Sequence, residues 1–252
     1  MEQQMPLSDQ TKEIIFGSLL GDGSLKIHKG YRNARFSFRH SESQFEYFLW
    51  KANNLNEISS SKKIFLQKND GGFSKKNKLR YQSKALESLT EIFDLTTKHN
   101  KLRIRRKWLN QMTALSLAIW WLDDGSLISN SRKGVFCTDG FDKKSVKILA
   151  QYLDKVWDIH THIGTVTDKR EGRNKEYYRL WIRSTDELKK FLRIILPHIP
   201  VSSMLYKALL LYKDQCLQQR WISEVEKSTN FSKKIIEEKF IEKRSKWKNF
   251  RE

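Results

Sequence analysis

Apolar side chains follow two different spacings along the first part of the chain, and each spacing predicts a different element. From Ser8 a polar start leads into an apolar run that stops at Gly21, which is typical of a buried helix. Residues 24–28 and 34–40 instead alternate apolar and polar side chains, as strands with one buried face do. These two short segments therefore predict an antiparallel hairpin.

The same order of elements occurs in both halves of the chain. After the hairpin, the first half continues with a helix, two strands and a helix, at 42–55, 62–68, 78–84 and 85–93. The second half repeats the whole order of helix, two strands, helix, two strands and helix, at 115–122, around 127, 135–138, 142–158, 160–167, 176–183 and 185–196. A further helical stretch at 204–217 leads into a charged tail that we expect to form a surface helix.

A literal repeat accompanies the repeated pattern. The tetrapeptide DGSL at 22–25 recurs at 124–127, an offset of 102 positions (124 − 22). A period this long predicts two pseudo-symmetric domains and not a solenoid. We therefore predict an α+β fold of two αββαββα domains, divided into a first domain, a basic linker, a second domain and a charged tail at 8–97, 98–112, 113–217 and 218–252.

The charge of the chain indicates the kind of partner. It contains 48 Lys and Arg residues against 29 Asp and Glu residues, for a formal net charge of +19. A globular protein this basic usually binds a polyanion, because neutralising phosphates releases counterions. The stretch KHNKLRIRRK at 98–107 holds six basic residues and no acid, so it is suited to lie along a phosphate backbone. A basic protein from a lysine-rich proteome is the alternative.

Several features of the sequence limit the cellular compartments in which we expect the protein. Two cysteines are too few for a disulfide framework or a zinc site, which fits a reducing environment. The first residues do not resemble a secretory signal or a transit peptide, and no apolar run approaches the length of a membrane span. We expect an intracellular protein, in an organelle matrix (mitochondrion or chloroplast) or a bacterial cytoplasm. We expect no association with a membrane.

Two nine-residue segments end in the repeated acids. IFGSLLGDG at 15–23 and LAIWWLDDG at 117–125 both resemble the signature of the LAGLIDADG homing endonucleases, and the resemblance extends over about 12–210. It implies two motif helices packed at a domain interface and antiparallel sheets that form a DNA-binding saddle. It also implies a monomer of the two-motif type that acts in intron homing by cutting a long asymmetric double-stranded DNA site.

The resemblance assigns the acids Asp22 and Asp124 as catalytic metal ligands. Two carboxylates brought close together repel unless divalent cations lie between them, and oxygen ligands favour Mg²⁺, with Mn²⁺ as a substitute. Such ions activate water and stabilise the leaving oxygen of a phosphodiester. The preceding residues, Gly21 and Asp123, are further candidates for the metal site, Asp123 as a structural residue or a secondary contributor. For a single motif, an apolar helix followed by an Asp-Gly turn is the alternative.

The two motif segments differ in side-chain size. Gly17, Ser18 and Gly21 allow another helix to approach the first motif closely, whereas the second motif carries the bulky pair at 120–121. We therefore expect the closer backbone contact through the first helix. The glycines after the acids, Gly23 and Gly125, are expected to let the chain turn sharply.

The resemblance also implies a basic catalytic residue in each half. Lys101 follows Asp22 by 79 positions (101 − 22), and Lys207 follows Asp124 by 83 (207 − 124). A lysine there can stabilise the developing phosphorane charge or polarise the attacking water. Lys98 is the substitute for Lys101, and coincidence is the alternative in a chain this rich in lysine.

Long polar side chains occupy the outward positions of the predicted strands and are candidate DNA contacts, because Arg reads guanine and Gln reads adenine in the major groove. In the first half they are Lys26, His28, Arg35, Arg39, Lys63, Gln67, Arg80, Gln82 and Lys84. In the second half they are Arg132, Lys133, Arg170, Arg173, Lys175, Arg179 and Arg183. The alternative for each one is a solvated strand face.

Two other functions use the same scaffold. One is an RNA-splicing maturase with intron RNA as its partner, and the other is a catalytically silent DNA-binding regulator. Both would tolerate the loss of the acids, and both acids are present at positions 22 and 124. We therefore favour metal-dependent phosphodiester hydrolysis of double-stranded DNA.

Overall fold

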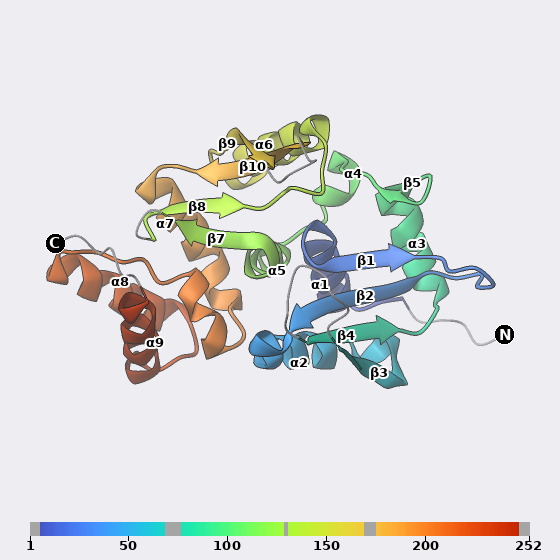
Figure 1. The fold of residues 1–252 in the computed structure, drawn as a ribbon, viewed down its shortest axis with the longest axis horizontal. Coiled ribbons are helices and arrows are strands. Elements are labelled where there is room, and N and C mark those ends of the chain that lie inside the picture. The colour runs from blue at the N-terminus through green and yellow to red at the C-terminus, as the bar shows by residue number, and fades with distance from the viewer. Residues whose placement is uncertain (1–5, 69–76, 129–130, 169–174, 247–252) are drawn as a thin grey trace. The chain divides into compact units, whose positions relative to one another are not determined.

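A computed structural model of the chain describes residues 6–68, 77–128, 131–168 and 175–246. The chain divides into two compact units, which we call unit 1 (Met1–Asp123) and unit 2 (Asp124–Glu252). Each unit combines helices with an antiparallel sheet (Figure 1). Within the described residues, no helix is both long enough and apolar enough to span a membrane.

Unit 1 begins with the first motif helix and contains most of the second. Its elements are α1 (Asp9–Leu20), β1 (Gly23–Lys26), β2 (Arg35–Ser41), η1 (Glu42–Gln44), α2 (Phe45–Asn54), η2 (Asn56–Ile58), β3 (Ser59–Gln67), β4 (Lys78–Ser83), α3 (Glu87–Thr96), β5 (Thr97–Lys98), β6 (Lys101–Leu102), α4 (Arg106–Leu109) and α5 (Ala114–Asp124). Ser8 caps α1, because its side chain accepts a hydrogen bond from the Thr11 amide at 3.3 Å.

The main sheet of unit 1 has the strand order β1-β2-β4-β3. Its inner face is apolar, since Phe36, Phe38 and Tyr81 are buried. Helices α1, α2 and α3 pack against its strands (Figure 1). Its outer face carries the polar residues of the alternation, with Arg39 opposite Arg80 across the β2–β4 pair. The alternation predicted for 34–40 is therefore confirmed.

Unit 2 repeats this arrangement and extends it. Its elements are β7 (Gly125–Ile128), β8 (Lys133–Phe136), α6 (Lys143–Trp157), β9 (His162–Asp168), β10 (Lys175–Ile182), α7 (Thr185–Ile195), η3 (Leu196–His198), η4 (Ser202–Lys207), α8 (Gln215–Ser228) and α9 (Lys233–Ser245). The sheet order is β7-β8-β10-β9, which matches unit 1. Asp142 caps α6, and Asp158 ends it in the left-handed conformation at φ 54°. The predicted fold, two copies of αββαββα, is confirmed.

The basic segment expected as a linker has secondary structure of its own. Strands β5 and β6 form a hairpin whose two connecting residues, His99 and Asn100, have φ of 51° and 59°. Helix α4 follows, and its Trp108 is buried and stacks on Phe16 of α1 at 5.9 Å between ring centroids. The segment therefore packs with unit 1, and the boundary between the compact units falls after Asp123.

One predicted helix is wrong. The stretch 204–217 contains the end of η4, then seven residues without regular structure, before α8 begins at Gln215. Its backbone carbonyls accept hydrogen bonds from side chains of α8 and α9, so they are not used in a helical ladder. The charged tail after this stretch does form helices, and these have buried faces, as Trp221 and Ile236 show.

Candidate metal and nucleic-acid site

The first motif helix ends where two helices of unit 1 approach closely. A Cβ atom at Gly17 would lie 2.4 Å from the Ser116 carbonyl oxygen of α5, and one at Gly21 would lie 2.4 Å from Cβ of Asp123. The Ser116 hydroxyl also donates to the Glu13 carbonyl at 3.0 Å. The expected close approach through glycines of the first motif is therefore confirmed.

Gly23 serves close packing and not a left-handed turn. It begins β1, and a Cβ atom there would lie 2.7 Å from Cβ of Ser18. Among the described residues, Gly30 is the glycine with a positive φ. We expected Gly23 to allow a sharp turn after the first acid. Glycine is required there instead because a larger side chain would collide with Ser18.

Asp22 lies in a cluster with two further ligand types. Single ligand atoms of Asp22, His40 and Asp123 all lie within 4.8 Å of one another. Nδ1 of His40 is 3.3 Å from Oδ2 of Asp22, and Nε2 is 3.9 Å from Oδ1 of Asp123. The side chains of His40 and Asp123 are fully buried, whereas that of Asp22 is 40% exposed. Asp22 therefore forms the accessible side of the cluster.

Asp123 is engaged by buried partners from unit 1. Lys51 donates to its two carboxylate oxygens at 2.7 and 2.9 Å, and the Tyr47 hydroxyl donates at 2.9 Å. Its Oδ2 also accepts from the Asp22 amide at 3.3 Å. A buried carboxylate needs such compensation, because an unpaired charge there is strongly unfavourable. This arrangement matches the structural role considered for Asp123, and it fixes the backbone beside Asp22.

The three residues of the cluster differ in how well their donor atoms suit a divalent cation. Asp22 offers a partly exposed carboxylate, which suits a hard cation such as Mg²⁺. His40 adds an imidazole nitrogen, which suits transition metals better. The Asp123 oxygens already accept from Lys51 and Tyr47, so Asp22 is the residue of this cluster that best fits the role of metal ligand.

In unit 2 the charges of Asp124 and of a buried lysine, Lys207, both act on one cysteine. Asp124 directly precedes β7, and its carbonyl accepts from the Cys137 amide at 3.0 Å. The segment η4, which ends at Lys207, packs against β7. Burial raises the pKa of the Cys137 thiol, and the charges of Asp124 and Lys207 act on it as well. Asp124 and Lys207 thus share one electrostatic environment within unit 2, and Lys207 is only 7% exposed.

The lysine predicted for the first half has a different setting. Lys101 lies on β6, opposite Lys98 across the β5–β6 hairpin, and both residues are exposed. The hairpin brings the primary candidate and its substitute side by side. The candidate lysines of unit 1, Lys101 and Lys98, are therefore exposed, whereas the candidate lysine of unit 2, Lys207, is buried.

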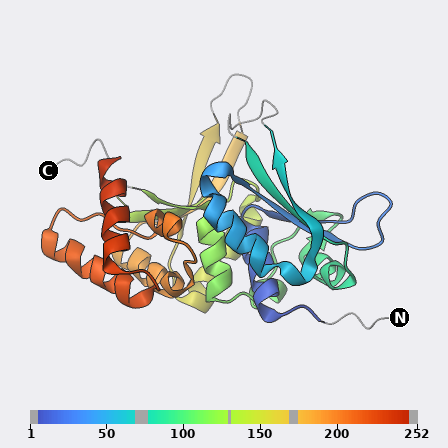
Figure 2. The same cartoon turned by 90° about the horizontal axis from the view of Figure 1, so that it is seen from below.

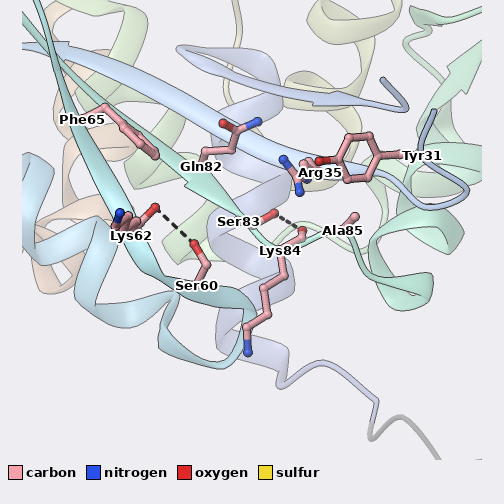
Figure 3. Close-up of a pocket in the computed structure, with 9 residues that line it drawn as sticks. All are labelled: Tyr31, Arg35, Ser60, Lys62, Phe65, Gln82, Ser83, Lys84 and Ala85. Carbon is pink, nitrogen blue, oxygen red and sulfur yellow. Dashed lines mark hydrogen bonds between the residues drawn. The ribbon is translucent and has the colours of Figure 1, made fainter. Parts of the chain in front are cut away.

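The outer face of the unit 1 sheet gathers the predicted DNA contacts. Cross-strand register pairs Lys26 with Arg35, and Gln82 lies on the same face as Arg80. A cavity of about 370 Å³ opens here (Figure 3) and is lined by Tyr31, Arg35, Ser60, Lys62, Phe65, Gln82, Ser83, Lys84 and Ala85. The Arg35 guanidinium stacks over the Tyr31 ring at 4.1 Å from its centroid, which orients its donors.

A register shift in β3 changes one predicted contact. The pairing of β3 with β4 shifts between Ser59 and Ile64. Lys62 consequently lines the cavity, whereas Lys63, the predicted residue, donates to Asn56. Between these pairs β3 advances five residues (64 − 59) while β4 advances two (83 − 81). Such extra residues move the following side chains relative to simple alternation, so the shift could not be predicted from the pattern alone.

The outer face of the unit 2 sheet is partly neutralised. Arg179 makes two hydrogen bonds to Asp139, at 2.7 and 2.6 Å, so its guanidinium is already paired. Lys175 lies 5.2 Å from the centre of the Tyr177 ring. The other predicted contacts that the structure describes, which are Arg132, Lys133 and Arg183, are exposed. Arg170 and Arg173 lie outside the described residues.

Comparison with known proteins identifies the family. A model of the LAGLIDADG DNA endonuclease family matches residues 12–191. The chain belongs to this family. The matched range includes both signature segments, and the fold repeats once in each unit, as expected for a LAGLIDADG protein with two motifs.

Relatives of this LAGLIDADG chain carry several names. It is 27% identical to Protein RecA of Mycolicibacterium flavescens over 226 residues, which is 83% of this chain and 48% of that protein. It is 29% identical to cytochrome b mRNA maturase bI2 of Saccharomyces cerevisiae over 215 residues, 80% of this chain and 48% of that protein. It is 25% identical to DNA endonuclease I-ChuI of Chlamydomonas applanata, over 81% of this chain and 96% of that protein. The chain thus spans about half the length of the first two proteins.

A solved structure shares the fold. The homing endonuclease I-WcaI bound to its DNA recognition sequence aligns with a TM-score of 0.69 at 23% identity, over 82% of this chain and 89% of that one. This likeness agrees with the two-unit LAGLIDADG architecture.

Two residues of the LAGLIDADG site were not predicted from the sequence. His40 continues the inward alternation of Phe36 and Phe38 on β2, so a polar residue at a buried strand position was the available signal. Lys51 lies among apolar residues of α2 and is fully buried, at 5.0 Å from the Phe38 ring centre. A charged residue on the buried face of a helix was the corresponding signal there.

Proposed function

We propose that the chain is a metal-dependent, site-specific endonuclease that cuts a long asymmetric site in double-stranded DNA. In this proposal Asp22 and Asp124 are the metal ligands, and the protein acts as a monomer because one chain holds both motifs. The observation that carries it is the position of Asp22, at the end of the first signature helix, partly exposed and 3.3 Å from His40. Membership of the LAGLIDADG DNA endonuclease family supports it.

Mg²⁺, or Mn²⁺ in its place, fits the carboxylates of the two motifs. A bound Mg²⁺ would act as a Lewis acid on the phosphate and lower the pKa of the attacking water. Asp22 would hold the cation, His40 would orient the Asp22 carboxylate, and Asp123 would fix the Asp22 amide through its hydrogen bond. Lys207 would stabilise negative charge as it develops on the phosphate.

DNA binding would use the outer faces of the two sheets. The cavity around Arg35 and Gln82 combines a fork of guanidinium donors with an amide, the two groups best suited to read guanine and adenine. The net charge of +19 supports attraction to the phosphate backbone. Homing to an intron site would follow from recognition of a long target.

A library of randomised DNA targets tests the proposal. The wild-type chain in Mg²⁺ should yield ends that accumulate at one long site, and Asp22→Asn and Asp124→Asn should abolish them, because each removes a metal ligand. Asp94→Asn, an exposed acid on α3, is the matched control and should cut like wild type. DNA that is bound but never cut in Mg²⁺ or Mn²⁺ would remove the nuclease proposal.

A maturase is the second candidate, because the chain is 29% identical to a protein named cytochrome b mRNA maturase bI2. Binding of intron RNA and stimulation of its splicing would be measured with the wild-type chain and Asp22→Asn. Under this alternative, splicing continues in Asp22→Asn, since RNA folding needs no cleavage of DNA. A catalytically silent regulator would instead bind DNA tightly and show neither activity.

A further inference from the structure

The backbone that follows Lys207 is buried without being a helix or a strand. Residues 208–211 are at most 1% exposed, yet they form no regular element. Buried carbonyl groups require hydrogen-bond partners, because leaving them unpaired is costly. In this segment the partners come from the side chains of α8 and α9.

Lys243 of α9 donates hydrogen bonds to the backbone on both sides of Lys207. Its ammonium group donates to the Tyr206 carbonyl at 2.6 Å and to the Leu209 carbonyl at 2.6 Å. The residue is only 8% exposed, and among the described residues no acidic side chain forms an ion pair with it. One buried amino group thus connects the carbonyl before Lys207 with a carbonyl two residues after it.

Helix α8 supplies the remaining partners of the segment. The Trp221 indole donates to the Ala208 carbonyl at 3.2 Å. The Gln218 side chain donates to the Leu210 carbonyl at 3.1 Å and accepts from the Tyr212 amide at 2.8 Å. Trp221 and Gln218 are both buried. Three side chains therefore bind five backbone groups between Tyr206 and Tyr212.

These helices also pack where the proposed catalytic lysine is located. Helix α9 contacts η4, which ends at Lys207, and η4 contacts β7, which begins directly after Asp124. Figure 2 shows α8 and α9, in orange and red, side by side. Both helices follow the range 12–191 that the family model matches.

We propose that α8 and α9 form a clamp that positions Lys207 for catalysis, with Lys243 as the principal positioning residue. The inference rests on the proposed nuclease function and adds to it a role for the charged tail. Lys243 touches neither DNA nor metal in this proposal. It acts by fixing the backbone on both sides of Lys207, and a misplacement of about 1 Å in a catalytic group can cost about a hundredfold in rate.

Single-turnover cleavage of the target site, with DNA binding measured separately, tests the clamp. Lys243→Met should lower the cleavage rate about tenfold or more while Kd changes by less than about threefold, because only the position of Lys207 changes. Lys243→Arg keeps two donors and should restore most of the rate. The matched control is Lys234→Met, an exposed lysine of the same helix, which should cut like wild type.

A double-mutant cycle separates positioning from a general loss of structure. In the Lys207→Met background, Lys243→Met should cause no further loss, because the group it positions is already absent. Additive losses, a loss of equal size in Lys234→Met, or wild-type cleavage by Lys243→Met would overturn the proposal. Trp221→Phe removes one donor and keeps an aromatic ring in its place, and it provides a milder variant if Lys243→Met does not fold.

Hydrogen exchange tests the clamp without using cleavage. Amides in the peptide covering residues 204–213 should exchange about tenfold faster in Lys243→Met than in wild type, and unchanged in Lys234→Met. If exchange is faster in Lys243→Met but the wild-type chain cuts no DNA, the clamp stands and the nuclease function is contradicted. Unchanged exchange would remove the clamp whether or not DNA is cut.

Discussion

The main sheets of the two units have equivalent strand orders, but the units hold their functional side chains by different means. In unit 1 the support comes from side chains, since Lys51, Tyr47 and His40 surround Asp123 and Asp22 in a buried polar cluster. In unit 2 the Cys137 amide donates to the Asp124 carbonyl at 3.0 Å, and Lys243 binds the carbonyls of Tyr206 and Leu209 on either side of Lys207. A repeated topology therefore fixes where an acid lies, whereas the local sequence decides how it is held.

The largest expected effect comes from breaking the cluster in unit 1. Lys51→Met leaves the buried Asp123 carboxylate without its cation, so the free energy of unfolding should fall by about 3–5 kcal/mol. Urea unfolding followed by fluorescence measures this. Removing both charges, in Lys51→Met with Asp123→Leu, should recover part of the loss. A loss below about 1 kcal/mol in the single variant would show that unit 1 does not depend on this pair.

A smaller effect is expected from the contact between motif helices. Gly17→Ala places a methyl group 2.4 Å from the Ser116 carbonyl oxygen, so the helices must separate, at a cost of about 1–3 kcal/mol. Thermal and urea unfolding measure the change. Gly140→Ala is the control, because a Cβ atom there meets nothing within 4 Å. Equal stability of the two variants would contradict the steric account.

The smallest effect concerns the pH dependence of unit 2. Burial lowers the pKa of Lys243 to about 7, from about 10.4 in an unfolded chain. Between these values the unfolded state binds more protons, so this residue makes the protein more stable as pH rises from 7 towards 10. Relative to Lys243→Met, the wild type should gain about 1 kcal/mol of unfolding free energy for each pH unit above 7.

Urea unfolding of wild type and Lys243→Met at pH 7, 8 and 9 checks this sign. Parallel pH curves for the two proteins would contradict it. The comparison isolates one residue, because every other titrating group is common to both proteins.

The sequence was informative where local pattern decides structure. The capped start at Ser8, the alternation of 34–40 and the repeated DGSL motif predicted the elements and the duplicated fold, because each depends on neighbouring residues. The sequence was less informative where side chains distant in the sequence determine the backbone conformation. The irregular segment after Lys207 has a helical pattern, but side chains of α8 and α9 bind the carbonyls of Ala208, Leu209 and Leu210.

The candidate site shows the same division. The signature located Asp22 and Asp124, since the motif is contiguous in the sequence. His40 and Lys51 belong to other elements and meet Asp123 only in the folded unit 1. The shift in β3 that exchanges Lys62 for Lys63 arises from pairing with β4, which no single strand encodes.

The boundary after Asp123 has a consequence for exchanging halves between related LAGLIDADG proteins. A crossover placed in the basic segment 98–112 would transfer Asp123 with the second half, although its partners Lys51 and Tyr47 belong to the first. A chimera made there would inherit a mismatched charge inside unit 1 unless the donor carries an equivalent acid. The basic segment is therefore a poor junction, and compatible halves must be selected by the residue that precedes Asp124.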